Sequence, residues 1–139
     1  MGGTFAKGLE GKLGLREGQR VAIIGATPEV LEFFNKSFPY LEFSTSLRGG
    51  FELVIYFATR NSDLSRRINT LTRSLRDKGA LWIAWPKKTS RIVTDLSFDV
   101  VQETGIAQSL VDTKICSISD TWSALRFAQR VSQPVGVGV

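Results

Sequence analysis

Continuous apolar runs, each closed by glycine, proline or a small polar residue, recur along the chain. The clearest are 21–24, 53–58 and 80–85. Runs of this kind are typical of parallel strands that are buried on both faces of a sheet. We therefore predict three central strands at these positions.

Helices are predicted between and after these runs. Thr27 and Pro28 provide an N-cap hydroxyl and a proline at the first helical position, and that helix reaches about Lys36. A second helix is predicted over 63–78, ended by Gly79, because four apolar residues recur at helical spacing: Leu64, Ile68, Leu71 and Leu75. A third begins at Thr94 or Asp95 and ends near Gly105.

Shorter segments complete the pattern. We predict a short helix over 7–13, a short strand over 41–44, and two strands over 114–118 and 121–128 that meet in an antiparallel hairpin at Ser119-Asp120. The alternation predicts an α/β fold: a three-layer, Rossmann-like, mostly parallel sheet that ends in this hairpin. We expect a single α/β domain over 1–132 and a flexible C-terminal tail over 133–139.

Composition narrows the function classes. The chain has 139 residues, 42% of them hydrophobic, and no apolar run approaches the ~20 residues of a membrane span. It contains no histidine, which excludes Ser-His and Cys-His nucleophile pairs and most transition-metal sites, so no metal site is expected. A single cysteine, Cys116, excludes an internal disulfide, and the first residues lack the apolar stretch of a secretory signal. These features predict a cytoplasmic protein in which Cys116 is an inert buried thiol.

The formal net charge of +5 favours anionic partners. Nucleic acid is not the expected partner, because the cations are spread out and are not interleaved with aromatic residues. Five cations lie on the predicted 63–78 helix, namely Arg66, Arg67, Arg73, Arg76 and Lys78. They form either a docking surface for an acidic protein segment or an ordinary solvated helix face.

A candidate binding site follows from the strand ends. Ligands of such sheets bind outside the carboxyl ends of the parallel strands. This rule places five residues on one rim: Arg60, Lys87, Lys88, Asp120 and Trp122. Three cations beside an aromatic ring and a carboxylate would suit a small anionic or planar ligand. Trp85 and Arg126 complete the candidate set of ligand-binding residues.

Each candidate residue also has a structural explanation. Lysines after a strand-ending proline are often part of a solvated loop. Trp82, Trp85 and Trp122 are large enough to serve as core residues. Asp112 and Asp120 could cap turns, and Arg126 could pair with either of them.

The loop after the first strand does not favour ordinary nucleotide-cofactor binding. It reads GATPEV, where a dinucleotide or S-adenosylmethionine site needs several glycines for close backbone approach. Pro28 lacks an amide donor, and Glu29 brings a negative charge. The acid expected after the second strand, for the ribose hydroxyls, is replaced by Ser44-Thr45-Ser46. No cofactor is assigned from the sequence.

Several segments resemble a family of small uncharacterised bacterial proteins, a domain of unknown function, over about residues 5–130. The segments are LREGQRVAIIGA, ALWIAWPKKTS, TDLSFDVV and LVDTKICSISDTWSALRFAQR. The residues that match its most specific motifs are Trp85, Pro86, Lys87, Asp95, Asp112, Lys114, Cys116, Trp122, Ser123 and Arg126. The resemblance implies no reaction. The opening LREGQRVAIIG also resembles the lead-in to the first strand of methyltransferases, which implies a distant, truncated methyltransferase-like domain.

Three functions are therefore open. The first is a binding module for a small anionic ligand or an acidic partner. The second is a divergent, methyltransferase-like transferase in which Asp95, Asp112 or Asp120 acts as acid or base and Lys87 stabilises negative charge. The third is a scaffold or oligomerisation protein that uses the basic helix or the last edge strand as its interface.

Overall fold

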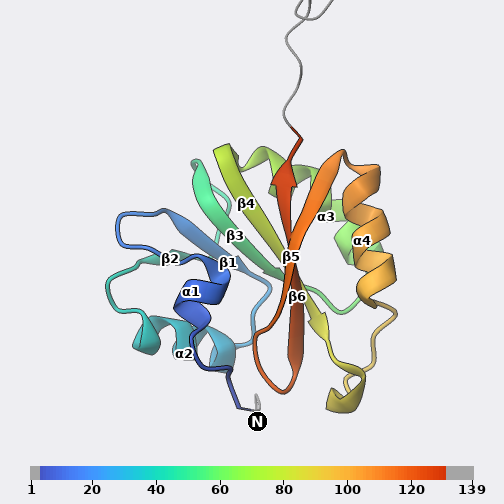
Figure 1. The fold of residues 1–139 in the computed structure, drawn as a ribbon, viewed down its shortest axis with the longest axis horizontal. Coiled ribbons are helices and arrows are strands. Elements are labelled where there is room, and N and C mark those ends of the chain that lie inside the picture. Colours follow the sequence, from blue (N-terminus) through green and yellow to red (C-terminus); the bar gives the residue numbers. More distant parts are fainter. Residues whose placement is uncertain (1–3, 131–139) are drawn as a thin grey trace, which may run out of the picture.

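Six strands form one sheet in the order β2-β1-β3-β4-β6-β5 (Figure 1). The computed structural model describes residues 4–130, so the predicted tail at 133–139 and residues 131–132 of the predicted domain lie outside the described residues. The strands are β1 (Val21–Ile24), β2 (Phe43–Ser44), β3 (Phe51–Phe57), β4 (Leu75–Pro86), β5 (Leu110–Ser117) and β6 (Trp122–Gln129). The first four are parallel, and β6 runs antiparallel to both β4 and β5. The predicted mostly parallel sheet with a closing antiparallel hairpin is confirmed.

Helices cover both faces of the sheet. They are α1 (Leu9–Leu13), α2 (Pro28–Ser37), α3 (Asn61–Arg73) and α4 (Phe98–Ala107), with a short 3₁₀ helix, η1 (Lys88–Ser90). Buried residues of α1 and α2 belong to one apolar core, and those of α3 and α4 belong to another. Figure 1 shows the two pairs of helices on opposite sides of the view. The three-layer, Rossmann-like α/β class is therefore confirmed.

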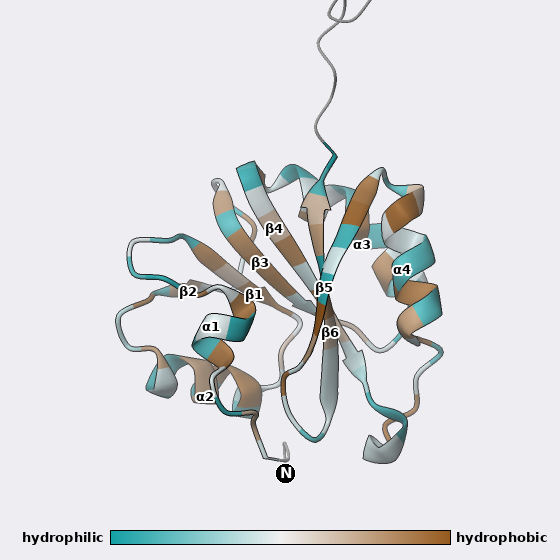
Figure 2. Ribbon diagram, viewed as in Figure 1, coloured by the Kyte–Doolittle hydropathy of each residue, from teal (hydrophilic) through white to brown (hydrophobic). Residues whose placement is uncertain are grey.

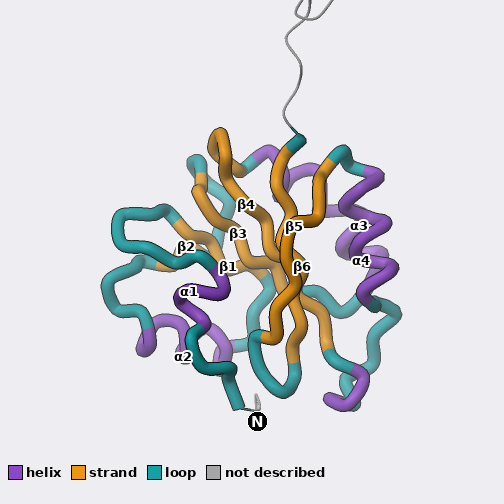
Figure 3. Tube along the Cα trace, viewed as in Figure 1, coloured by secondary structure: helices purple, strands orange, loops and turns teal. Residues whose placement is uncertain are grey.

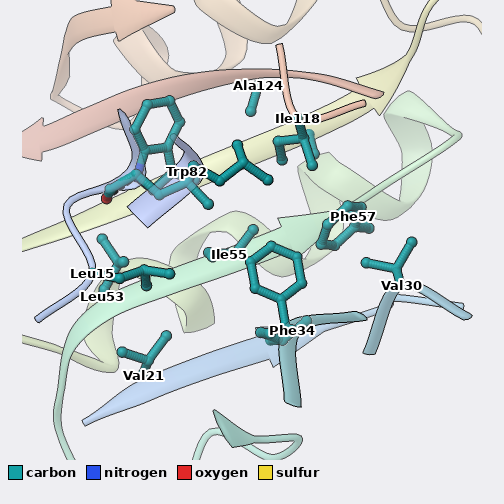
Figure 4. Close-up of a cluster of buried hydrophobic side chains, with 14 of the residues drawn as sticks. Leu15, Val21, Val30, Phe34, Leu53, Ile55, Phe57, Trp82, Ile118 and Ala124 are labelled. Carbon is teal, nitrogen blue, oxygen red and sulfur yellow. Dashed lines mark hydrogen bonds between the residues drawn. The ribbon is translucent and has the colours of Figure 1, made fainter. Parts of the chain in front are cut away.

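The central strands supply both cores because successive side chains point to opposite faces. In β3, Leu53 and Ile55 face the α1–α2 core, whereas Val54 and Tyr56 face the α3–α4 core. Figure 2 shows these strands as largely hydrophobic. Trp82 is fully buried in the α1–α2 core, and its indole N–H donates to the Leu13 carbonyl at 3.1 Å (Figure 4).

The connections after β1 and β3 leave the sheet in opposite directions. The chain after β1 forms α2, whose Val30 and Phe34 pack into the α1–α2 core. The chain after β3 forms α3, whose Leu64 and Ile68 pack into the other core. The adjacent strands β1 and β3 therefore flank the topological switch point, where open α/β sheets leave a crevice.

The start of α2 is confirmed. Thr27 has extended backbone and its hydroxyl accepts from the Val30 amide at 3.3 Å, while Pro28 occupies the first turn. In contrast, α4 begins at Phe98 and not at Thr94 or Asp95, because Ser97 caps it by accepting from the Val100 amide. Thr94 and Asp95 instead form hydrogen bonds with residues at the start of α3.

The predicted helix over 63–78 is too long. The structure ends α3 at Arg73, where the Ser74 hydroxyl donates to the Leu71 carbonyl at 2.6 Å. Leu75 keeps the helical spacing in the sequence, yet it pairs with Phe51 as the first residue of β4. Gly79 is consequently not a helix cap; a Cβ there would lie 2.9 Å from the Phe51 carbonyl oxygen.

None of the helices within residues 4–130 is long and apolar enough to cross a membrane.

Candidate functional site

The loops after β4 and after β5 meet at the carboxyl edge of the sheet. Pro86 pairs with Trp122 across β4 and β6, and the Lys87 amide donates to the Thr121 carbonyl at 2.7 Å. Figure 3 shows the β5–β6 loop and the η1 segment at the same, lower side of the molecule. Residues about 35 positions apart in the chain are thus neighbours at this edge (an estimate that follows from a hairpin returning to its parallel neighbour).

A pocket of about 410 Å³ lies at the same edge, between the ends of β1 and β3. We call it the switch-point pocket. Its lining comes from the loop after β1, the end of β3, the first two turns of α3, the β4–α4 loop and the start of β6: Gly25, Thr27, Tyr56, Phe57, Ala58, Thr59, Asp63, Arg66, Arg67, Ile92 and Trp122. Its volume falls within the range of small-molecule sites, and its position is the one at which open α/β sheets bind ligands.

Three aromatic residues line the switch-point pocket: Tyr56, Phe57 and Trp122. Tyr56 is 3% exposed and belongs to the α3–α4 core, whereas Trp122 belongs to the α1–α2 core and contacts Phe57 edge-on at 5.1 Å between ring centroids. Burial raises the pKa of the Tyr56 hydroxyl, and the positive charge of Arg67 opposes that rise. Tyr56 is therefore a neutral phenol at physiological pH, able to donate or accept a hydrogen bond.

Two arginines bring positive charge to the pocket. The guanidinium of Arg67 lies over the Tyr56 ring, 5.4 Å from its centroid. Arg66 forms an ion pair with Asp63 at 2.9 Å, which offsets its charge. Arg67 makes no ion pair within residues 4–130, so it is the cation that remains available to a ligand.

Gly25 shapes the wall of the pocket at the end of β1. Its φ is +76°, and a Cβ at this position would lie 2.6 Å from the Phe57 carbonyl oxygen. Both the backbone conformation and the close approach of β3 require glycine. The first strand can therefore turn sharply away into α2 while its end stays against β3.

The predicted rim residues lie at this edge but mostly outside the pocket. The Lys87 ammonium donates to the Ser117 hydroxyl at 2.6 Å, and Lys88 is exposed at the start of η1. The Asp120 carboxylate accepts from the Thr4 amide at 3.3 Å and the Asp120 amide donates back to Thr4. Asp120 thus ties the N-terminal segment to the hairpin, and of the seven predicted residues Trp122 lines the pocket.

The other predicted residues are dispersed. Arg60 is exposed at the N-cap of α3, next to the pocket residue Thr59. Trp85 is buried on the α3–α4 face, where its ring contacts Phe98 at 6.5 Å. Arg126 lies opposite Trp82 in the middle of β6. The predicted pairing of Arg126 with an aspartate is wrong, because its guanidinium donates to the Thr113 hydroxyl at 3.0 Å. A ligand-binding role for these residues stays a prediction.

The β4–α4 loop is fixed to the start of α3 by two side chains. The Thr94 hydroxyl donates to the Thr59 carbonyl at 2.6 Å, and the Asp95 carboxylate accepts from the Asn61 amide at 2.7 Å. Asp95 thereby satisfies an otherwise unpaired amide of the first helical turn. These two hydrogen bonds hold the β4–α4 loop against the start of α3. Ile92 of that loop and Thr59 both line the switch-point pocket.

Sequence reasoning did not find most of the pocket. Arg66 and Arg67 belong to the predicted basic helix but not to the predicted rim. A signal existed, because both lie in the second turn of a helix that directly follows a buried strand, and that turn is near the carboxyl edge. Tyr56 gave no such signal, since it stands inside an apolar run.

No family model matches the chain, and no curated protein matches it. Among solved structures it is similar to a S-adenosylmethionine-dependent methyltransferase from Aquifex aeolicus, with a TM-score of 0.61, 14% identity and coverage of 90% of both chains. A magnesium protoporphyrin IX methyltransferase from Synechocystis PCC 6803 gives a TM-score of 0.58 and 11% identity, over 88% of this chain and 77% of that one. The chain has a methyltransferase-like Rossmann fold.

A third structure differs in length. An O-methyltransferase family 2 protein from Planctomyces limnophilus gives a TM-score of 0.60 and 11% identity over 90% of this chain. This chain spans about half the length of that protein, 54%. The likeness extends to the fold and not to the remainder of the longer enzyme.

The methyltransferase-like fold implies S-adenosylmethionine, and the residues present fit it poorly. Gly25 supplies one close backbone approach, but Pro28 lacks an amide donor and Glu29 brings a negative charge to the first turn of α2. Ser44 stands at the end of β2 in place of a ribose-binding carboxylate, and its hydroxyl already donates to the Ser46 carbonyl at 2.7 Å. Two of the usual contacts to a nucleoside group are therefore missing.

Proposed function

We propose that this chain is a ligand-binding domain that holds a small anionic molecule with an aromatic or planar part in the switch-point pocket. Arg67 carries the proposal, because it is a cation without an ion-pair partner in residues 4–130 and it lies over the buried ring of Tyr56. A carboxylate or phosphate would pair with its guanidinium. The planar part of the ligand would lie beside Tyr56, on the same face of the sheet as Arg67.

The position and polarity of the pocket support the proposal. The pocket lies at the switch point between β1 and β3. Two of the residues that line it, Thr27 and Thr59, carry hydroxyl groups. A few polar groups in a largely apolar pocket are typical of small-molecule sites. An acidic side chain of a partner protein would offer the same carboxylate chemistry, and the test below includes it.

Thermal shift and calorimetric titration with a defined panel test this proposal. The panel holds p-hydroxybenzoate, AMP and an acidic hexapeptide, and saturating ligand at about 100 times its Kd raises the free energy of unfolding by about 2.7 kcal/mol. We expect Arg67→Gln to weaken binding about tenfold or more, the usual cost of a lost charge-assisted contact. The matched control is Arg73→Gln, which removes an exposed cation from the last turn of the same helix.

Two outcomes contradict the proposal. One is an absence of saturable binding with every panel member. The other is an equal loss of binding in Arg67→Gln and Arg73→Gln. That result would mean that binding depends on the net charge of the protein and not on the position of Arg67.

Methyl transfer is the second candidate, and the fold neighbours favour it more directly than they favour the first. The Aquifex aeolicus and Synechocystis methyltransferases share the fold over most of both chains. The missing carboxylate after β2 argues against it. Titration with S-adenosylhomocysteine separates the candidates: saturable binding that Arg67→Gln leaves unchanged would support methyl transfer, and no heat of binding would remove it.

A further inference from the structure

A second cavity lies on the opposite side of the central sheet layer from α3 and α4, beside α1. It measures about 290 Å³ and is lined by Gly11, Lys12, Leu13, Gly14, Thr113, Lys114 and Arg126. We call it the Arg126 hollow. Three of its lining residues are cations and none is an acid. A neighbouring cavity of about 440 Å³ shares Leu13, Gly14 and Arg126 with it.

A β-bulge creates this concentration of charge. Asp112 pairs with Phe127, but the next pair is Lys114 with Arg126, so Thr113 is an extra residue in β5. A regular ladder would place Thr113 opposite Arg126 and turn Lys114 towards the α4 face. The bulge instead sets two cations directly opposite each other, an arrangement that destabilises a sheet.

Within residues 4–130 no ion pair offsets the repulsion, and the acids Glu17 and Glu52 line the neighbouring cavity but not the Arg126 hollow. Lys12, Lys114 and Arg126 are absent from the ion pairs of this part of the chain. The nearest acid in β5, Asp112, accepts from the Gln102 side chain of α4 at 2.9 Å and so faces the other side of the sheet. Cys116, which was predicted to be a buried thiol, is only half-buried. Burial raises the pKa of its thiol, and the positive charges of Lys114 and Lys12 oppose that rise.

The guanidinium of Arg126 is held in a defined position. It donates to the Thr113 hydroxyl at 3.0 Å, and that hydroxyl also donates to the Arg126 carbonyl at 3.3 Å. The bulged residue thus fixes the arginine that it brings opposite Lys114. A fixed guanidinium with two flexible ammonium groups is suited to an anion that carries more than one negative charge.

From the bulge, the cations and the cavity together we infer that the Arg126 hollow is a binding site for a small, multiply charged oxyanion. It is separate from the switch-point pocket and does not depend on the function proposed for that pocket. The anion would relieve the repulsion between Lys114 and Arg126, so binding and stability are linked.

Isothermal titration calorimetry at low ionic strength tests the inference with pyrophosphate and, in a second arm, citrate. We expect saturable binding, weakened about tenfold or more by Lys114→Gln and by Arg126→Gln. Arg73→Gln, with the same change in charge on the opposite face, is the control and keeps the wild-type Kd. The arm that binds more tightly identifies the oxyanion as a phosphate or a carboxylate.

Stability without ligand gives a second measurement. Lys114→Gln removes the like-charge pair, so its midpoint of thermal unfolding in low salt exceeds that of the wild type by about 1–5 °C. Pyrophosphate then raises the midpoint of the wild type more than that of the variant. A variant less stable than the wild type in low salt contradicts the charge argument.

Two binding results overturn the inference. The first is no saturable binding of either anion. The second is loss of binding in Arg67→Gln but not in Lys114→Gln, which would move the anion to the switch-point pocket and support the function proposed there.

Discussion

Gly25 illustrates how a single residue joins fold and pocket. Its φ of +76° disfavours any residue with a Cβ, and that Cβ would also meet the Phe57 carbonyl oxygen at 2.6 Å. Gly14 has nearly the same φ, +79°, but open space around its missing Cβ. The two positions therefore separate backbone strain from steric contact.

We predict that Gly25→Ala lowers the free energy of unfolding by about 2–4 kcal/mol, and Gly14→Ala by about 1–2 kcal/mol. The difference measures the contact with the end of β3. Urea unfolding followed by far-UV circular dichroism gives both values. Equal losses in the two variants would mean that the end of β3 moves away from the added Cβ at little cost in free energy.

At the scale of elements, Glu52 connects the beginnings of three strands. Its carboxylate accepts from the Arg20 amide, just before β1, at 2.6 Å and from the Arg76 guanidinium of β4 at 2.6 Å. The hydrogen bond from the Arg20 amide and then that from the Arg76 side chain lower the pKa of Glu52 below its ordinary value of 4.5. This contact exists because Arg76 lies in β4 and not on the predicted helix.

A depressed carboxyl pKa in the folded state has a defined effect on stability. Glu52 contributes stability above its unfolded-state pKa, and the contribution is lost as the pH falls through the lower folded-state pKa. We therefore predict that Glu52→Gln is less stable than the wild type at pH 7 and that the difference shrinks below about pH 4.5. Urea midpoints from pH 7 to pH 3 measure it, and a difference independent of pH would assign the effect to packing.

Elements were easier to predict than their ends. The runs at 53–58 and 80–85 are continuously apolar, and such short runs are typical of strands buried on both faces of a sheet, so the sequence alone predicts them. The predicted end of the helix was wrong at Leu75, because the spacing of Leu75 from Leu71 is helical. Its actual pairing with Phe51 depends on a strand that is distant in the sequence. The bulge at Thr113 is likewise invisible in the sequence, because register is decided by the partner strand.

The candidate site could likewise be predicted only in part. The predicted strand ends placed Lys87 and Trp122 at one edge of the sheet, because Lys87 follows a strand and Trp122 begins one. They could not select the pocket residues, because the face that α3 covers depends on packing between layers. Arg126 shows the limit: its strand was predicted, but its neighbours Thr113 and Lys114 were not.

At the scale of the whole molecule, one sheet separates two apolar cores, and each core contains tryptophan. Trp82 and Trp122 belong to the α1–α2 core, and Trp85 belongs to the α3–α4 core. The strands β1, β3 and β4 contribute alternate side chains to both cores. Loss of packing on one face therefore removes the support of the other, and we expect the domain to unfold as one cooperative unit.

Leu13 provides the test, because it is 1% exposed and lies on the α1 side only. In a background with Trp82→Phe and Trp122→Phe, the fluorescence of Trp85 reports on the far core. We predict that Leu13→Ala lowers the free energy of unfolding by about 2–4 kcal/mol as seen by Trp85, with the same midpoint by far-UV circular dichroism. A Trp85 transition unmoved by Leu13→Ala would show that the two faces unfold separately, because the sheet would then survive the loss of one helical layer.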